Sequence, residues 1–329
     1  MTRSSVWLLP GLVLLLLVLC LASLAIGTTP MPVLSGLCDW LGGQTSLPAI
    51  VIGEVRLPRT LLAVAAGACL GLAGAALQGL LRNPLADPSL TGASQGAALG
   101  AAAVFYFGLF PALGAFAAAA GGLLGAGLAL ALVLWLAGAA NPGRVVLAGL
   151  AVSTLAGAAL AAVLTLAPNP YALQELIFWL MGSVSDRGLD QLWVLGPALL
   201  LGMLLVCSQR GLLHALSLGE GVAQSLGFAV GRGTRLVVGG CALLVGASVA
   251  VAGGIGFVGL MVPHLLRPLV AHRADRLLVP CALAGGSLVL LADMAVRLMP
   301  PGRQLQLGVL TTLVGAPLFV RLVFKERSA

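Results

Sequence analysis

The feature that most constrains this chain is a succession of long apolar runs that continues from one end of the sequence to the other. Each run has about 17–25 residues, which as a helix is enough to cross the roughly 30 Å hydrocarbon core of a bilayer. A membrane β-barrel would show alternating polarity in segments of about ten residues, and this sequence lacks that pattern. We therefore expect an all-α integral membrane protein.

Composition supports the same class. Hydrophobic residues make up 60% of the chain and charged residues 8%, whereas about 25% of the residues of a soluble domain are charged. We treat residues 1–329 as a single transmembrane domain with about ten helices. The predicted spans are residues 6–26, 57–80, 91–107, 113–137, 144–167, 192–207, 236–252, 255–270, 277–298 and 307–324.

The first run has two interpretations. It follows Arg3 and ends in small residues such as Ala22 and Ala25, as a secretory signal peptide does. Its apolar stretch of about twenty residues is longer than the usual core of 7–15 residues. We expect a retained first span, with a cleaved signal peptide as the alternative.

The basic residues lie singly between the apolar runs, so they indicate topology rather than a nucleic-acid patch. An even number of spans places both ends of the chain on the same side. If that side is the cytoplasm, inner segments carry twelve Lys and Arg residues and outer segments carry five. Both termini are therefore predicted to be cytoplasmic, in a multi-pass protein of the inner (plasma) membrane.

Glycines are abundant, at 45 in the chain, and small residues let membrane helices approach closely. Gly67 and Gly71 are four residues apart, as are Gly92, Gly96 and Gly100, so each set lies on one helical face. We expect these faces to pack helices together. The pairs Asn83-Pro84 and Asp87-Pro88 should break the chain after the second span, in a structural turn rather than a ligand contact.

Two segments fit neither a span nor an ordinary loop. Residues 168–188 contain a short apolar stretch, 176–181, in which Trp179 is expected to anchor an interfacial segment. Residues 210–235 form the longest inner loop, and apolar residues at 218, 222 and 226 have the spacing of a short helix bounded by glycines. That helix is predicted to lie on the cytoplasmic surface.

The chain lacks the residues that would let it act as an enzyme. It contains one lysine, Lys325, and no Gly-Lys-Ser/Thr, so it cannot form the usual phosphate-binding loop of an ATPase. No His-Glu-x-x-His is present, and no nucleophile–base pair stands out. If ATP drives this protein, another subunit must hydrolyse it.

Metal sites and ion relays are not predicted either. His264 and His272 have no second ligand at metal spacing, and the six cysteines form no close pair. We therefore expect neither a metal nor a cofactor. The clear intramembrane acid, Asp293, is four residues before Arg297, which favours an ion pair over a role in ion-coupled transport.

Several further segments share an order and spacing that extends from about residue 56 to residue 324. They are residues 56–59 (Arg-Leu-Pro-Arg) with 67–74 and 78–79, residues 82–88 with 91–97, residues 179–183, residues 218–220 with 226–227, and residues 253–264 with Arg267, Gly308 and 315–317. In the order and spacing of these segments the chain resembles the FecCD family, the permeases of type II ABC importers for ferric siderophores, haem and cobalamin. It departs from the family at Gly254, where many relatives carry proline, and at 304–306, where an acid followed by Leu-Pro is common.

The resemblance implies a fold, partners and a function. The fold is ten helices per subunit in a homodimer around a central pathway. The partners are two cytoplasmic ABC ATPase subunits and a periplasmic or lipid-anchored substrate-binding protein. The function is inward transport of a metal chelate, with a ferric siderophore as the first expectation and cobalamin or haem as alternatives. An ion-coupled secondary transporter is the alternative from another class.

The resemblance also implies site residues. The ATPase-coupling segment would contain Leu218, Gly219, Glu220, Ala223, Leu226 and Gly227, with a solvated loop helix as the alternative. The residues that dock the binding protein would be Arg56, Arg59 and Arg297; Arg56 and Arg59 could equally be anchors that extend to lipid headgroups. A cytoplasmic gate would contain Asn141, Pro142 and Gly143.

Overall fold

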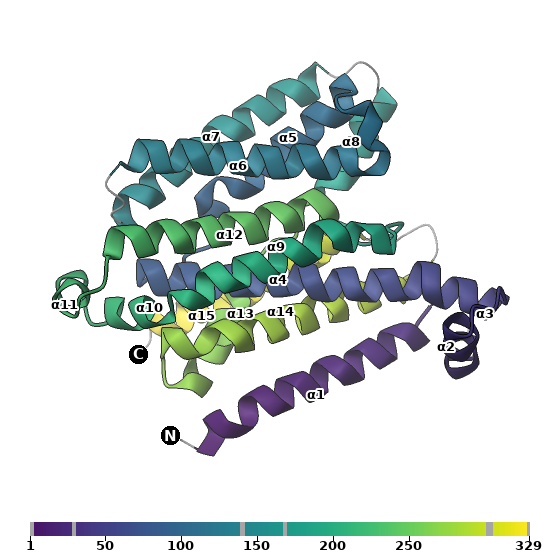
Figure 1. Ribbon diagram of the computed structural model, residues 1–329, viewed down its shortest axis with the longest axis horizontal. Coiled ribbons are helices and arrows are strands. Elements are labelled where there is room, and N and C mark those ends of the chain that lie inside the picture. Colours follow the sequence, from purple (N-terminus) through teal and green to yellow (C-terminus); the bar gives the residue numbers. More distant parts are fainter. Residues whose placement is uncertain (1–2, 28–30, 139–141, 167–169, 301–304, 328–329) are drawn as a thin grey trace.

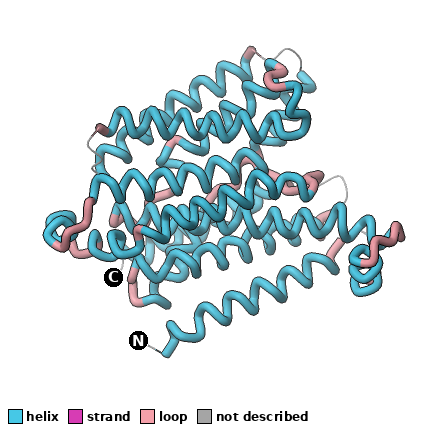
Figure 2. The backbone as a smooth tube through the Cα atoms, viewed as in Figure 1, coloured by secondary structure: helices cyan, strands magenta, loops and turns pink. Residues whose placement is uncertain are grey.

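The computed structural model describes the chain except for residues 1–2, 28–30, 139–141, 167–169, 301–304 and 328–329. The described part contains helices and no strands, joined by short connections (Figure 2). Most of the helices lie side by side along the longest axis of the molecule (Figure 1). The prediction of an all-α protein is therefore confirmed.

Each of the ten predicted spans coincides with a helix. Seven helical stretches are long and apolar enough to cross a membrane, and three shorter apolar helices accompany them among the described residues. The ten are α1 (Arg3–Ala25), α4 (Leu57–Leu81), α5 (Ala93–Phe107), α6 (Ala117–Ala137), α7 (Pro142–Thr165), α9 (Leu192–Ser208), α12 (Val230–Ala252), α13 (Val258–Leu266), α14 (Ala274–Arg297) and α15 (Leu307–Arg327). A 3-10 turn, Arg267–Val270, continues α13.

Shorter helices mark the two ends of the bundle. At one end, called the outer end after the predicted topology, lie α2 (Val33–Leu41) and α3 (Leu47–Ile50) (Figure 1). At the opposite, inner end lie α10 (Arg210–Leu216) and α11 (Glu220–Ser225). The start of α1 and the end of α15 are at this inner end as well (Figure 1).

Glycines bring the central helices into backbone contact. Helix α4 is buried along most of its length and packs on α14. A Cβ added at Gly67 would lie 2.2 Å from the Gly285 carbonyl oxygen, and one at Gly71 would lie 2.1 Å from the Cys281 carbonyl oxygen. The predicted packing face of α4 is confirmed, because any larger side chain would separate these helices.

The α5–α6 pair is built in the same way. A Cβ at Gly100 would lie 2.1 Å from the Gly121 carbonyl oxygen, and one at Gly125 would lie 2.0 Å from the Gly96 carbonyl oxygen. Helix α7 packs beside this pair at the edge of the bundle (Figure 1). Its outward leucines, Leu147 and Leu155 among them, are exposed, so this edge faces lipid or another chain.

Helix α8 (Pro170–Leu180) contains most of the short apolar stretch found in the sequence. The stretch 176–181 was predicted to lie at the membrane interface, but Leu176 at its start is buried and Trp179 is half-buried. The following turn is held by the end of α12, since Ser183 N donates to the Ala252 carbonyl at 2.8 Å. Helix α8 therefore packs on the bundle through Leu176, while Ile177 and Phe178 are exposed, and its place at the membrane interface stays a prediction.

Candidate functional site

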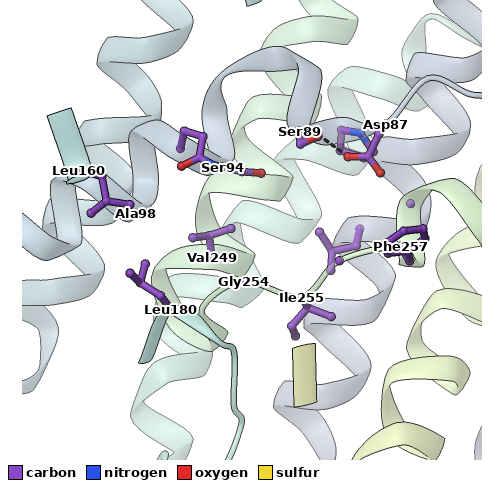
Figure 3. Close-up of a pocket in the computed structure, with 15 residues that line it drawn as sticks. Asp87, Ser89, Ser94, Ala98, Leu160, Leu180, Val249, Gly254, Ile255 and Phe257 are labelled. Atoms are coloured by element: carbon purple, nitrogen blue, oxygen red, sulfur yellow. Dashed lines mark hydrogen bonds between the residues drawn. The ribbon is translucent and has the colours of Figure 1, made fainter. Parts of the chain in front are cut away.

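A cavity of about 400 Å³ lies where α5, α7, α8 and α12 meet the turns before α5 and before α13. We call it the Asp87 cavity (Figure 3). Its lining residues are Leu70, Asp87, Pro88, Ser89, Ser94, Gln95, Ala98, Leu160, Leu180, Val249, Gly254, Ile255, Gly256, Phe257 and Gly259. One part of the wall is polar and the rest is apolar.

The polar part comes from the turn that follows α4. The helix ends at Arg82 in a left-handed conformation, and the proline at position 84 cannot continue it. The Asp87 carboxylate then accepts a hydrogen bond from Ser89 N at 2.8 Å, which starts the 3-10 turn Pro88–Thr91 (Figure 3). The predicted structural turn is confirmed, and the structure adds that Asp87 lines the cavity.

Helices α5 and α7 complete this wall. Ser94 and Gln95 lie in the first turn of α5, and both side chains are half-buried. Ser153 of α7 donates to the Ser89 carbonyl at 3.0 Å, so α7 is tied to the same turn. The wall thus offers a hydroxyl, an amide and a carboxylate to whatever enters the cavity.

The opposite wall is built from irregular backbone. Residues 253–257 leave α12 without forming a helix, and their backbone contacts the segment after α8 and the start of α15. Gly254 N donates to the Leu180 carbonyl at 3.2 Å, and Gly308 N donates to the Met181 carbonyl at 3.1 Å. Irregular backbone is tolerated at membrane depth where it lines a cavity or is buried in protein. We call these three segments the glycine junction.

This junction requires glycine because the backbones of its three segments are in direct contact. A Cβ at Gly308 would lie 2.0 Å from the Gly254 carbonyl oxygen. One at Gly253 would lie 2.1 Å from the Trp179 carbonyl oxygen. Gly254, where the sequence departs from the family, is a backbone contact of this junction.

A second constellation lies at the outer ends of α4 and α14. Arg297 Nε donates to Asp293 Oδ2 at 2.8 Å, and Arg59 Nε donates to Asp293 Oδ1 at 2.8 Å. The predicted Asp293–Arg297 ion pair is confirmed. The bond from Arg59 to Asp293 could not be predicted from helical spacing, because the two residues are 234 positions apart in the sequence.

Arg297, together with the neighbouring Arg56, also holds the end of α1. Arg56 Nη1 donates to the carbonyl of Leu24 at 2.7 Å, and Arg297 Nη1 donates to the carbonyl of Ser23 at 2.9 Å. The last carbonyls of a helix lack partners within the helix, and cations stabilise that end. The cluster therefore fastens α1 to α4 and α14.

These contacts bear on the predicted docking residues. A docking role needs guanidinium groups that face solvent, yet Arg56 is 4% exposed and Arg297 is 8% exposed. The side chain of Arg59 is 17% exposed and is bonded to Asp293. The structure gives all three arginines an internal role in this chain, and docking remains a prediction.

The predicted coupling segment contains the short helix that the sequence indicates. Helix α11 is bounded by Gly219 with φ 117° and Gly227 with φ 85°, conformations that L side chains rarely adopt. Ala223 is buried against the bundle, whereas Leu218 and Leu226 are each 61% exposed. Glu220 begins the helix, half-buried.

Helix α10 joins this segment to α14. The carboxylate of Asp275 accepts hydrogen bonds from Arg273 at 2.8 and 3.1 Å, and it lies 3.6 Å from His214 Nδ1 of α10. No role for these residues was predicted from the sequence. Of the predicted gate, Asn141 lies outside the described residues, while Pro142 and Gly143 begin α7 at the inner end of the bundle.

Together, these features define a multi-pass helical membrane protein with an internal cavity and a structured surface segment at one end. The chain belongs to the FecCD transport family, which it matches over residues 15–325. The resemblance found in the sequence is thereby confirmed.

Individual relatives agree along nearly the whole chain. The vitamin B12 import system permease protein BtuC of Klebsiella pneumoniae is 38% identical over 330 residues, covering 99% of this chain and 95% of that one. The hemin transport system permease protein HmuU of Yersinia pestis is 37% identical over 325 residues, covering 97% of each. A solved structure described as a metal-chelate type ABC transporter in an inward-facing conformation matches with a TM-score of 0.85 and 33% identity, covering 96% of this chain and 98% of that one.

Proposed function

We propose that this chain is the permease subunit of an ABC importer that carries a metal chelate, cobalamin or haem across the inner membrane into the cytoplasm. The observation that carries this proposal is the full-length similarity to import permeases, in sequence and in fold. Within this class we expect a ferric siderophore as the cargo, with cobalamin and haem as the alternatives.

Energy for transport would come from ATPase subunits at the inner end. The chain has no phosphate-binding lysine motif of its own. The exposed leucines of the coupling segment, Leu218 and Leu226, form a surface that a solvated loop helix would not need. Glu220, which begins α11, would meet a basic group of the ATPase.

The cargo would pass the Asp87 cavity. Its sparse polar groups and broad apolar wall can contact a bulky ligand without holding it tightly, as a transient passage requires. Gly143 and Pro142, at the inner end of α7, would contribute to the gate below. The exposed edge formed by α7 supports a second copy of this chain as the neighbour across the pathway.

The outer end would receive a periplasmic or lipid-anchored substrate-binding protein. Of the three predicted arginines, Arg59 is the most exposed and is the best candidate for such a contact. An acidic group of the binding protein would compete with Asp293 for its guanidinium. Arg56 and Arg297 would support that site from below by holding α1.

An ion-coupled carrier is the alternative mechanism, and the environment of Asp293 weighs against it. A coupling acid must gain and lose an ion, whereas both oxygens of Asp293 are engaged by Arg59 and Arg297. We expect uptake to stop when cellular ATP is depleted and to survive collapse of the proton gradient.

The test is uptake of labelled ferric siderophore, cobalamin and haem in cells that lack this gene and in cells that regain it. Restored uptake of one cargo, together with copurification of an ATPase, would support the proposal and identify the substrate. Uptake that follows the proton gradient, or the absence of any copurifying ATPase, would contradict it.

A further inference from the structure

A second cavity, also of about 400 Å³, lies toward the outer end of the bundle and shares no lining residue with the Asp87 cavity. It is enclosed by the second half of α5, the segment that leads into α6, and α8. We call it the Arg187 cavity. Its lining residues are Ala101, Val104, Phe105, Gly108, Leu109, Pro111, Gly114, Ala117, Ala118, Leu176, Trp179 and Arg187.

The chemistry of this lining is simple. Arg187 provides its single charged group, and the other lining residues are aliphatic, aromatic or glycine. Phe105 is 41% exposed and Leu109 is 45% exposed, so the apolar wall continues to the surface of the bundle. Pockets that are mostly apolar with one or two polar groups are typical of small-molecule sites.

Arg187 is half-buried, and no hydrogen bond or ion pair within 4 Å joins its guanidinium to another described residue. Burial lowers the pKa of Arg187, while the carboxylates of Asp186 and Asp190 act through space in the opposite direction. Asp190 accepts a hydrogen bond from the side chain of Gln191 at 3.1 Å, so its carboxylate is engaged elsewhere. Arginine stays charged under these conditions, which leaves a partly desolvated cation beside an apolar cavity.

A charge in this position is stabilised by an anion that can reach it, because ion pairing and hydrogen bonding offset the loss of water. An apolar body attached to that anion would fill the cavity and remove its wall from water or lipid. We propose that the Arg187 cavity binds an amphiphile whose carboxylate or phosphate pairs with Arg187 and whose apolar part lies against Trp179 and Phe105. Two sources have this chemistry: an anionic phospholipid of the surrounding leaflet, and an acidic group of the cargo, which rests on the proposed function.

The lipid source is tested on the purified full-length chain by native mass spectrometry, with phosphatidylglycerol and phosphatidylcholine as probes. Wild type is expected to bind phosphatidylglycerol more tightly. Arg187→Ala should weaken that binding about tenfold, as the loss of one charge-assisted contact predicts. Ala118→Leu should weaken it with Arg187 in place, because the added atoms occupy the cavity. Arg321→Ala, which removes an exposed arginine from α15, is the matched charge control.

The cargo source is tested by uptake of ferric siderophore in cells that carry Arg187→Ala. A several-fold rise in the KM of uptake with unchanged phosphatidylglycerol binding assigns the site to cargo. Weaker phosphatidylglycerol binding with an unchanged KM assigns it to lipid. The proposal is overturned if neither Arg187→Ala nor Ala118→Leu changes lipid binding or KM, or if Arg321→Ala changes lipid binding as much as Arg187→Ala does. Absence of uptake of ferric siderophore, cobalamin and haem in wild type would contradict the proposed function alone, since the lipid measurement does not depend on transport. Thermal stability of each purified variant shows that it is folded.

Discussion

Replacing Gly308 with alanine tests the glycine junction directly. The new Cβ would lie 2.0 Å from the Gly254 carbonyl oxygen and 2.4 Å from the Met181 carbonyl oxygen. Ordinary contacts begin near 3.4 Å, so the start of α15 would have to move away from both segments by more than about 1 Å. Backbone rather than flexible side chain is in the way, and backbone cannot yield locally.

The cost can be worked out from the bonds that this movement breaks. Gly308 N donates to the Met181 carbonyl at 3.1 Å, and Leu307 N donates to the Gly182 carbonyl at 2.9 Å. Leaving a buried backbone group without its partner costs about 1–3 kcal/mol. Alanine regains about 1 kcal/mol because it favours a helix more than glycine does. Two such groups at the middle of that range cost about 4 kcal/mol, so we expect Gly308→Ala to lower the free energy of unfolding by about 3 kcal/mol.

The measurement is thermal unfolding of the purified chain in detergent, where a loss of this size lowers Tm by roughly 5–10 °C. Gly239→Ala in α12 is the control, because a Cβ at that position has no neighbouring atom within 4 Å. Gly239→Ala should keep or slightly raise Tm. If both variants unfold at the same temperature, the junction is not packed as described, and the reasoning fails. Displacement of residues 254–257 should also reduce uptake, since they form one wall of the Asp87 cavity.

Three further predictions concern the other constellations. Asp293→Ala should lower the free energy of unfolding by about 3–5 kcal/mol, since it leaves buried arginines without a counter-charge, whereas Arg59→Ala should cost less; unfolding in detergent compares them. Leu226→Asp should abolish copurification of the ATPase without lowering Tm, because the side chain is exposed; retained copurification would exclude this leucine from the contact. Gln95→Leu should change the KM of uptake several-fold at unchanged ATPase copurification; an unchanged KM would place the cargo elsewhere.

The helices could be predicted from sequence because each needs only its own residues. An apolar run of sufficient length has no alternative in a bilayer, so all ten spans were found. The short α11 was found for a related reason, since Gly219 and Gly227 stop a helix locally whatever surrounds it.

Long-range partners could not be predicted in this way. The ion pair of Asp293 with Arg297 follows from helical spacing, but the second partner, Arg59, is set by how α4 packs on α14. Trp179 was expected at the interface because a short apolar stretch with an aromatic residue is typical of such segments. Gly253, whose missing side chain admits the Trp179 backbone, holds this segment against the end of α12, and a contact of that kind cannot be read from the sequence.

The hold on α1 has a consequence for the order in which the protein is made. Helix α1 is the first span to be synthesised, but one of the arginines that bonds its last carbonyls, Arg297, is 274 residues further along the chain than Ser23. At about 5–20 residues per second, ribosomes need roughly 15–55 s to bridge that distance. Until then the end of α1 is held by Arg56 and by the hydrogen bond between Ser23 and Thr60, without Arg297 and α14, and a nascent chain that stops before α14 presents a loosened first helix to the proteases of the membrane.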